Sequence, residues 1–222
     1  TFDMDQDDTF TQTTGQEVDI LFVVDNSGSM GDDQERLSDN FGKLAQVGEQ
    51  WQNDFHVGVV TTDMDETNGW RGKLMGEPRY VDNSNWQEFK DNVKVGDMGS
   101  ASEQGLFAAQ AALSFPLSHE TGVACAFDSD CEEPDLCVEG FCGGYNGGFM
   151  RKDATLHVVV VSDEQDDSPA ELAFYIDFLK SIKGYQNPNL LYLHSVVAGV
   201  DPEGTYTDCA GEAGTRYMEV SD

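Results

Sequence analysis

The stretch DNSGSMGDD, residues 25–33, follows directly on the apolar run VDILFVV and concentrates groups that can do chemistry. It supplies a carboxylate at Asp25, hydroxyls at Ser27 and Ser29, and two glycines. A phosphate cradle of this type normally carries a lysine, which the stretch lacks, and its further aspartates would repel a phosphate. A serine hydrolase needs a histidine to activate the hydroxyl, but the four histidines fall in strand patterns or near a cysteine-rich segment.

A cradle for a divalent cation fits these residue types better. Mg²⁺ prefers oxygen ligands in octahedral geometry and commonly keeps several waters. Ser27 and Ser29 can point at one ion, with Gly28 between them allowing a tight loop and Asp25 supplying charge directly or through water. Because few carboxylates would bind the ion directly, we expect it to keep an open position for an acidic group of a partner.

The elements that must position this loop follow from the hydrophobic pattern. Runs of Val, Leu and Ile predict strands buried on both faces at residues 18–25, 55–63, 155–163 and 190–200. Helical patterns between them cover residues 32–51, 102–115 and 168–184. The first has an apolar stripe at Leu37, Phe41, Leu44 and Val47, and the last opens with Ser168 as N-cap. This alternation predicts an α/β fold with a doubly wound, mostly parallel sheet flanked by helices.

In such a sheet, ligands gather beyond the carboxyl ends of the strands. That rule places the loop after residue 24 beside the turn GDMGSASEQG (residues 96–105) and beside Asp163 in VVVVSDEQDD. Ser100 and Ser102 are the competing hydroxyls of the turn. We therefore expect one metal site at this carboxyl edge of the sheet, which we call the rim.

These residues resemble a von Willebrand factor type A domain with its metal-ion-dependent adhesion site. D-x-S-x-S after a first buried strand matches Asp25, Ser27 and Ser29, and Asp163 matches the aspartate of the third loop. Ser100 stands where the family usually has Thr. The resemblance covers roughly residues 17–200 apart from an insertion. It implies a non-enzymatic module that binds a ligand through Mg²⁺ or Mn²⁺.

Further cation positions have competing interpretations. SMGDD resembles the integrin β-subunit version of the domain, which implies a second ion, usually Ca²⁺, held by Asp32 and Asp33. Acidic residues in the first turn of a helix are also favoured by its dipole alone. In the insertion, Asp128, Asp130 and Glu132 have a spacing that can hold Ca²⁺, although the full EF-hand pattern is absent.

The cysteines indicate an oxidising compartment. Four of the five form a C-x5-C-x5-C-x4-C segment without a zinc knuckle, which favours two disulfides of undetermined pairing among Cys125, Cys131, Cys137 and Cys142. For the remaining Cys209 we expect a partner beyond residue 222. We expect residues 1–16 to be an acidic linker and residues 17–222 a domain that lacks its last helix, with a cysteine-rich insertion at about 117–150.

Net charge and hydropathy exclude several classes of binding partner. The 222 residues carry 42 Asp and Glu against 12 Lys and Arg, a net charge of −30, which repels nucleic acid and anionic lipid surfaces. No apolar run approaches the length of a membrane span. We expect an extracellular or periplasm-facing bacterial protein that binds a protein or glycan ligand offering a carboxylate. The rim around the ion and the cysteine segment would form its specificity surface. The alternative is a structural subunit of a surface appendage or envelope complex, in which the ion stabilises a loop or a subunit contact.

Overall fold

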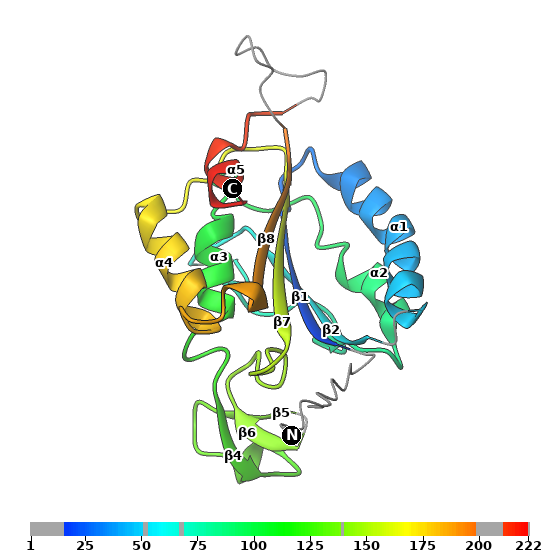
Figure 1. Cartoon of the computed structure of the whole chain (residues 1–222), viewed down its shortest axis with the longest axis vertical. Coiled ribbons are helices and arrows are strands. Elements are labelled where there is room, and N and C mark those ends of the chain that lie inside the picture. The colour runs from blue at the N-terminus through cyan, green and yellow to red at the C-terminus, as the bar shows by residue number, and fades with distance from the viewer. Residues whose placement is uncertain (1–15, 51–52, 67–68, 139, 199–210, 222) are drawn as a thin grey trace, which may run out of the picture.

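A five-stranded sheet forms the centre of the protein (Figure 1). The computed structural model describes residues 16–50, 53–66, 69–138, 140–198 and 211–221. In the sheet order the strands are β3 (Tyr80–Val81), β2 (Asp54–Thr61), β1 (Glu17–Val24), β7 (Thr155–Ser162) and β8 (Leu191–Val197). All neighbours pair in parallel except the short edge strand β3, which is antiparallel to β2. The prediction of a mostly parallel sheet is therefore confirmed.

Helices cover both faces of this sheet. They are α1 (Gly31–Gln50), α2 (Phe89–Asn92), α3 (Gly105–Ala112), α4 (Leu172–Ile182) and α5 (Thr215–Ser221), with single-turn 3-10 helices at Trp86–Glu88, Asp128–Asp130 and Pro188–Leu190. Figure 1 shows α1 and α2 on one face and α3, α4 and α5 on the other. A central strand between two helical layers has no face left for solvent, which explains its continuous apolar sequence.

The core consists of two apolar clusters, one on each face of the sheet. Alternate residues of β1 separate between them: Leu21 and Val23 face the α3 side, and Phe22 faces the α1 side. On the α1 side the rings of Phe41 and Phe89 stack with centroids 3.7 Å apart, and Phe22 lies 5.1 Å from Phe89. These aromatic contacts fix α1 and α2 against β1, directly below the loop that follows the strand.

The predicted apolar stripe of α1 is only partly right. Phe41 is buried, but Leu44 is 47% exposed, and the buried side also carries the polar Gln34 and Ser38. Gln34 Nε2 donates to the main-chain oxygen of Asp25, and Ser38 Oγ donates to that of Lys90. Hydrogen bonds to backbone oxygens of the loop after β1 and of α2 thus satisfy the polar side chains on the buried side of α1. Leu37 is half-buried, and the side chain of Val47 lies outside the described residues.

The predicted N-cap of the 168–184 helix is wrong. Helix α4 begins at Leu172, with Glu171 in the N-cap position. The hydroxyl of Ser168 instead donates to Asp166 Oδ1 at 2.7 Å and accepts the backbone N–H of Phe107 at 2.9 Å. Tertiary contacts therefore hold Ser168 in the loop before the helix.

The segment between α3 and β7 forms a small second sheet. Its strands, in the order β4 (Glu120–Ala124), β6 (Phe141–Gly143) and β5 (Leu136–Val138), are antiparallel. Two disulfides join Cys125 to Cys137 and Cys131 to Cys142, which confirms the expected bonds and resolves their pairing. We call residues 117–150 the disulfide module.

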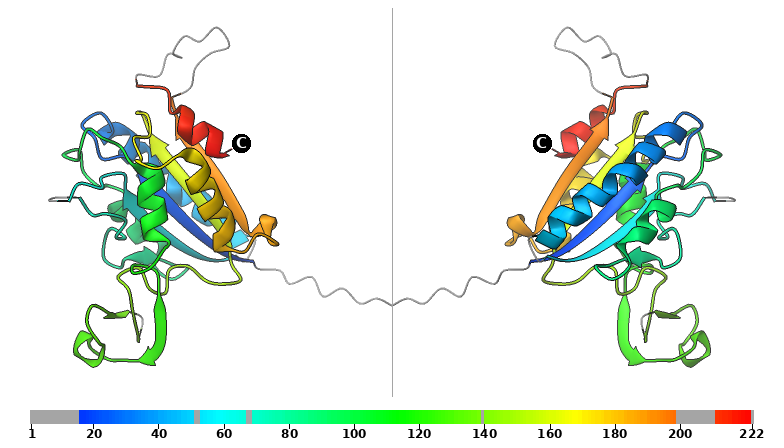
Figure 2. Two further views of the ribbon diagram at one scale, coloured as in Figure 1. Left: turned by 90° about the vertical axis from the view of Figure 1, so that its left-hand side faces the viewer. Right: turned by 90° about the vertical axis from the view of Figure 1, so that its right-hand side faces the viewer.

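The disulfide module lies at the end of the main sheet opposite the loop after β1, as both side views show (Figure 2). The connectivity explains this position, because β7 begins at Thr155 beside Val18, near the start of β1. The module therefore sits at the amino ends of the parallel strands. The expectation that it shares a surface with the metal-site rim is wrong.

Candidate functional site

The first loop holds Asp25 rigidly at the end of β1. Asp25 is fully buried, and its backbone N–H continues the sheet by donating to Val161 O at 3.0 Å. Its carboxylate accepts the N–H of Ser27 at 2.7 Å on Oδ1 and the hydroxyl of Ser162 at 2.6 Å on Oδ2. The Oγ atoms of Ser27 and Ser29 lie 3.2 Å apart, with Ser27 buried and Ser29 exposed. The two hydroxyls thus converge on one point at the surface.

The second loop packs against the first through a glycine that the sequence did not single out. Gly99 N–H donates to Asn26 O at 2.9 Å, and a Cβ at Gly99 would lie only 2.4 Å from Asn26 Cγ. The role expected for Gly28 is not required, because a Cβ there would make an ordinary 3.8 Å contact with Asp97 O. Close approach of the two loops therefore depends on Gly99.

Both competing hydroxyls of the second loop lie at this rim. The backbone N–H of Ser100 donates to Asp63 Oδ2 at 3.3 Å, and Ser100 Oγ accepts the N–H of Ser102 at 3.1 Å. Asp63, which follows β2, also accepts the N–H of Asp65 at 2.9 Å. Asp63 is therefore a positioning residue that holds Ser100 beside the first loop. The choice between the two serines as metal ligand stays a prediction.

The third loop brings Asp163 to the same point. A hydrogen bond with the Ser29 side chain lowers the pKa of Asp163, but burial has the larger effect and raises the pKa above its usual value, and the negative charge of Asp25 raises it further. Asp163 Oδ1 is buried without a hydrogen-bond partner among the described residues. The structure thus places Asp25, Ser27, Ser29 and Asp163 close together, and their role as metal ligands stays a prediction.

Residues at and just before the start of α5 form hydrogen bonds with the third loop, which begins at Asp163 after β7. The main-chain oxygen of Asp163 accepts the N–H of Glu212 at 2.7 Å, and Gln165 Nε2 donates to Thr215 Oγ1 at 2.5 Å. Buried Asp166 faces Arg216 Nε at 3.1 Å and accepts the N–H of Leu106 at the start of α3. These contacts fix the loop that carries Asp163 to two helices.

Two further carboxylates lie at this site: Glu103, which the sequence did not single out, and Glu164, one of the acidic residues after Asp163 that the sequence places near the rim. Glu103 is 0% exposed; its Oε2 accepts the Thr62 hydroxyl, and its Oε1 has no hydrogen-bond partner among the described residues. Burial raises the pKa of Glu103 to about 8, with further contributions from Asp25, Glu164 and Asp63. Burial, followed by the charges of Asp25 and Asp163, also raises the pKa of Glu164. Glu103 directly follows Ser102, and Glu164 directly follows Asp163. These positions indicate proximity to the site, but acidic residues are too abundant in this chain for position alone to distinguish them.

The site is negative without a basic counterpart. Within the part of the chain that the structure describes, no lysine, arginine or histidine forms an ion pair with Asp25, Asp63, Glu103, Asp163 or Glu164. Buried carboxylates without a cation or a proton are strongly unfavourable. The oxygen donors, together with Asp163 Oδ1 and Glu103 Oε1, which have no hydrogen-bond partner among the described residues, fit a hard cation such as Mg²⁺, Mn²⁺ or Ca²⁺.

The residues considered for a second ion have other partners in the structure. Asp32 and Asp33, in the first turn of α1, lie 2.9 and 2.8 Å from the guanidinium of Arg36. In the disulfide module, Asp130 Oδ2 accepts the N–H groups of Ala126 and Phe127, and Asp128 Oδ1 accepts that of Cys137. Glu132 is exposed. These contacts account for the aspartates without an ion.

The cysteines do not offer a metal site in the described structure. The sulfur atoms of Cys125, Cys131 and Cys142 lie close together, but each belongs to a disulfide. Cys209 lies outside the described residues.

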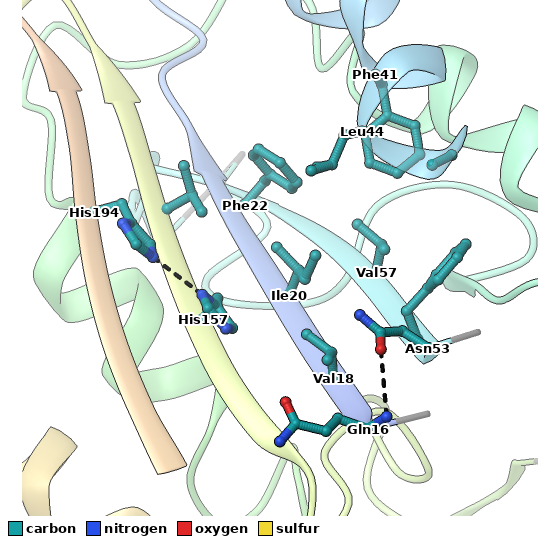
Figure 3. Close-up of a pocket in the computed structure, with 13 residues that line it drawn as sticks. Gln16, Val18, Ile20, Phe22, Phe41, Leu44, Asn53, Val57, His157 and His194 are labelled. Atoms are coloured by element: carbon teal, nitrogen blue, oxygen red, sulfur yellow. Dashed lines mark hydrogen bonds between the residues drawn. The ribbon is translucent and has the colours of Figure 1, made fainter. Parts of the chain in front are cut away.

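A separate apolar groove lies on the α1 side of the sheet (Figure 3). Val18, Ile20 and Phe22 of β1 form its floor, and Leu44 of α1 lies on one side. His157 and His194 lie across the floor from α1. None of the described residues that line this groove carries a carboxylate, so this lining differs chemically from the rim. None of the helices within the described ranges is long and apolar enough to cross a membrane.

Comparison with known proteins assigns no family. No protein-family model matches the sequence, and no curated protein matches it. Among solved structures, proximal thread matrix protein 1 from the mussel byssus has 11% identity and a TM-score of 0.48, over 94% of this chain and 42% of that one. The pilus adhesin SpaC from Lactobacillus rhamnosus GG has 12% identity and a TM-score of 0.32, over 83% and 28%. This chain thus spans less than half the length of either, and similarity at this level carries no functional argument.

Proposed function

We propose that this chain is a divalent-cation-dependent binding module that captures an acidic group of a partner through a metal ion at the carboxyl edge of the sheet. The observation that carries the proposal is the convergence of three loops on one point. Among the described residues, their carboxylates form no ion pair with a basic side chain, and the buried oxygens Asp163 Oδ1 and Glu103 Oε1 have no hydrogen-bond partner.

The proposed ligand set is Asp25, Ser27, Ser29, Ser100 and Asp163, with Glu103 as a carboxylate on the buried side. Ser162 and Thr62 hold Asp25 and Glu103 in place, so these carboxylates need little reorganisation to accept a cation. Ser29 is exposed whereas Asp25 and Glu103 are buried, so a partner approaches from one side only. The bound ion supplies a Lewis-acidic contact for the carboxylate of that partner.

The resemblance to a von Willebrand factor type A domain belongs to this proposal. Three features support it: the strand order β3-β2-β1-β7-β8, the antiparallel edge strand, and helices on both faces of the sheet. A doubly wound sheet binds ligands where the strand order reverses, and here β1 lies between β2 and β7 at that reversal. Asp25 leaves the sheet at this position.

We assign the module no bond-breaking activity. Such a reaction usually needs a general base of suitable pKa within reach of the reacting group, most often histidine. The four histidines lie away from the rim: His56 in β2, His119 before β4, His157 in β7 and His194 in β8. Glu103, the rim carboxyl whose pKa is raised to about 8, is fully buried and accepts the Thr62 hydroxyl, so we do not assign it the role of a base that reaches a substrate.

The two disulfides indicate an oxidising compartment. We place the module outside the cytoplasm of a bacterium, on the cell surface or facing the periplasm. A net charge of −30 favours partners other than nucleic acids.

The test is capture of the protein by candidate partner cells and matrix proteins in Mg²⁺ or in EDTA. Asp25→Asn removes the central charge, and Asp39→Asn, on the exposed side of α1, is the matched control. We expect capture that requires Mg²⁺, is lost in Asp25→Asn and is retained in Asp39→Asn. Equal capture in EDTA by the folded wild-type protein would contradict the proposal.

A structural role has one specific observation in its favour. The disulfide module and the metal-site rim lie at opposite ends of the sheet, as a subunit that joins two neighbours requires (Figure 2). If this alternative holds, deleting residues 120–143, the small sheet of the disulfide module, disrupts assembly without changing Mg²⁺ affinity, and Asp25→Asn disrupts assembly without affecting capture of soluble ligands.

A further inference from the structure

His157 and His194 bring two imidazoles together in the apolar groove. In the β7–β8 pairing His157 lies opposite Tyr192, and His194 lies opposite Val159, so the histidines are diagonal neighbours on one face of the sheet. His157 Nδ1 and His194 Nε2 are 3.0 Å apart, and the ring planes agree within 3° with centroids 5.3 Å apart. Figure 3 shows the two rings meeting edge to edge across the strands.

The surrounding residues favour the orientation and the neutral protonation state in which the imidazole of His157 can bind a metal. Tyr192 stacks on His157 with ring centroids 4.9 Å apart, which fixes the orientation of the imidazole. Burial, and then the neighbouring His194, lower the pKa of His157, so the neutral form that binds metals predominates at neutral pH. Among the described residues, the other polar side chains that line the groove are Gln16 and Asn53. Nitrogen ligands without carboxylates favour transition ions over Mg²⁺ or Ca²⁺.

We propose that His157 and His194 form a two-histidine site for Cu²⁺ or Ni²⁺, independent of the cation site at the carboxyl edge. The separation of the nitrogens is close to that between adjacent ligands of one metal ion. With metal–nitrogen bonds of about 2.1 Å, a 3.0 Å separation gives an angle of about 90° at the metal. This is the angle between adjacent ligands in square-planar or octahedral coordination, which Cu²⁺ and Ni²⁺ adopt, whereas tetrahedral Zn²⁺ needs about 3.4 Å.

Binding requires a change of tautomer but no net release of a proton. In the metal-free pair, one ring N–H donates to the facing nitrogen of the other ring. Coordination needs a lone pair on both facing nitrogens, so that proton moves to the outer nitrogen of the same ring. Both rings then turn toward the open side of the groove, where water occupies the remaining coordination positions.

The experiment is a titration of the protein with Cu²⁺ in saturating Mg²⁺, followed by calorimetry and by electron paramagnetic resonance. The wild-type protein should bind one Cu²⁺ with coupling to two imidazole nitrogens. His194→Gln should weaken binding at least tenfold and leave coupling to one nitrogen. His194 is exposed, so this variant should fold, and circular dichroism checks that it does.

Two matched variants separate this site from others. His119→Gln removes a histidine of the disulfide module, and Asp25→Asn removes the proposed Mg²⁺ site; both should bind Cu²⁺ like the wild-type protein. The proposal is overturned if the wild-type protein does not bind Cu²⁺, if folded His194→Gln binds it unchanged, or if Asp25→Asn abolishes binding.

Discussion

Replacement of Glu103 by glutamine should stabilise the metal-free protein at neutral pH. The Glu103 carboxyl is fully buried among other carboxylates, and its pKa is raised from 4.5 to about 8. A raised pKa means that the folded state binds more protons than the unfolded state, so stability is lost as pH rises from about 4.5 toward 8. A pH of 7 lies about 2.5 pH units above the unfolded-state pKa of 4.5, whereas the folded-state carboxyl is still largely protonated there. Burial of Glu103 therefore lowers the free energy of unfolding at pH 7 by about 3 kcal/mol. Glutamine keeps an oxygen to accept the Thr62 hydroxyl but carries no charge.

The assay is urea unfolding in EDTA at pH 4.5 and pH 7. Glu103→Gln should raise the free energy of unfolding at pH 7 by up to about 3 kcal/mol and change it little at pH 4.5, where Glu103 is protonated in the folded state and half protonated in the unfolded state. Glu35→Gln, on the exposed side of α1, is the control and should have no effect at either pH. A Glu103→Gln protein that is less stable than the wild-type protein at pH 7 would refute the electrostatic reasoning, since Glu103 would then act as an ordinary core hydrogen-bond partner.

Three further predictions concern the scaffold. Gly99→Ala should reduce Mg²⁺ affinity at least tenfold in calorimetry, because its Cβ would meet Asn26 at 2.4 Å, whereas Gly28→Ala should bind normally; equal affinities would show that the loops can separate freely. Phe89→Ala should lower the free energy of unfolding by about 3–5 kcal/mol, because it empties the centre of a stacked aromatic cluster; a loss below about 1 kcal/mol in urea unfolding would contradict that packing. Reduction of the two disulfides should increase hydrogen exchange in the disulfide module alone, and loss of Mg²⁺ binding on reduction would disprove the separation of module and site.

The strands could be predicted from the sequence because a parallel sheet covered on both faces demands continuous apolar runs. Residues 18–25 and 155–163 match β1 and β7 within one residue at each end. Helix details failed where tertiary contacts compete with local preference. Ser168 has the right chemistry for an N-cap, but Asp166 and the N–H of Phe107 engage its hydroxyl instead.

Those site residues that directly follow a strand could be predicted from the sequence. Asp25 and Asp163 follow β1 and β7, so the rule for carboxyl edges places them together. Glu103 follows no strand, and only its burial distinguishes it from the many solvated acidic residues of the chain. The position of the disulfide module depends on chain direction: a segment that enters β7 at its amino end must lie at the edge opposite the rim.

The most direct test of the cation site is a Mn²⁺ titration of the metal-free protein followed by electron paramagnetic resonance. The wild-type protein should bind Mn²⁺ in competition with Mg²⁺, and a variant combining Ser27→Ala and Ser29→Ala should lose that binding while keeping its circular dichroism spectrum. Unchanged Mn²⁺ binding by the folded double variant would contradict the proposed role of the hydroxyl pair as metal ligands.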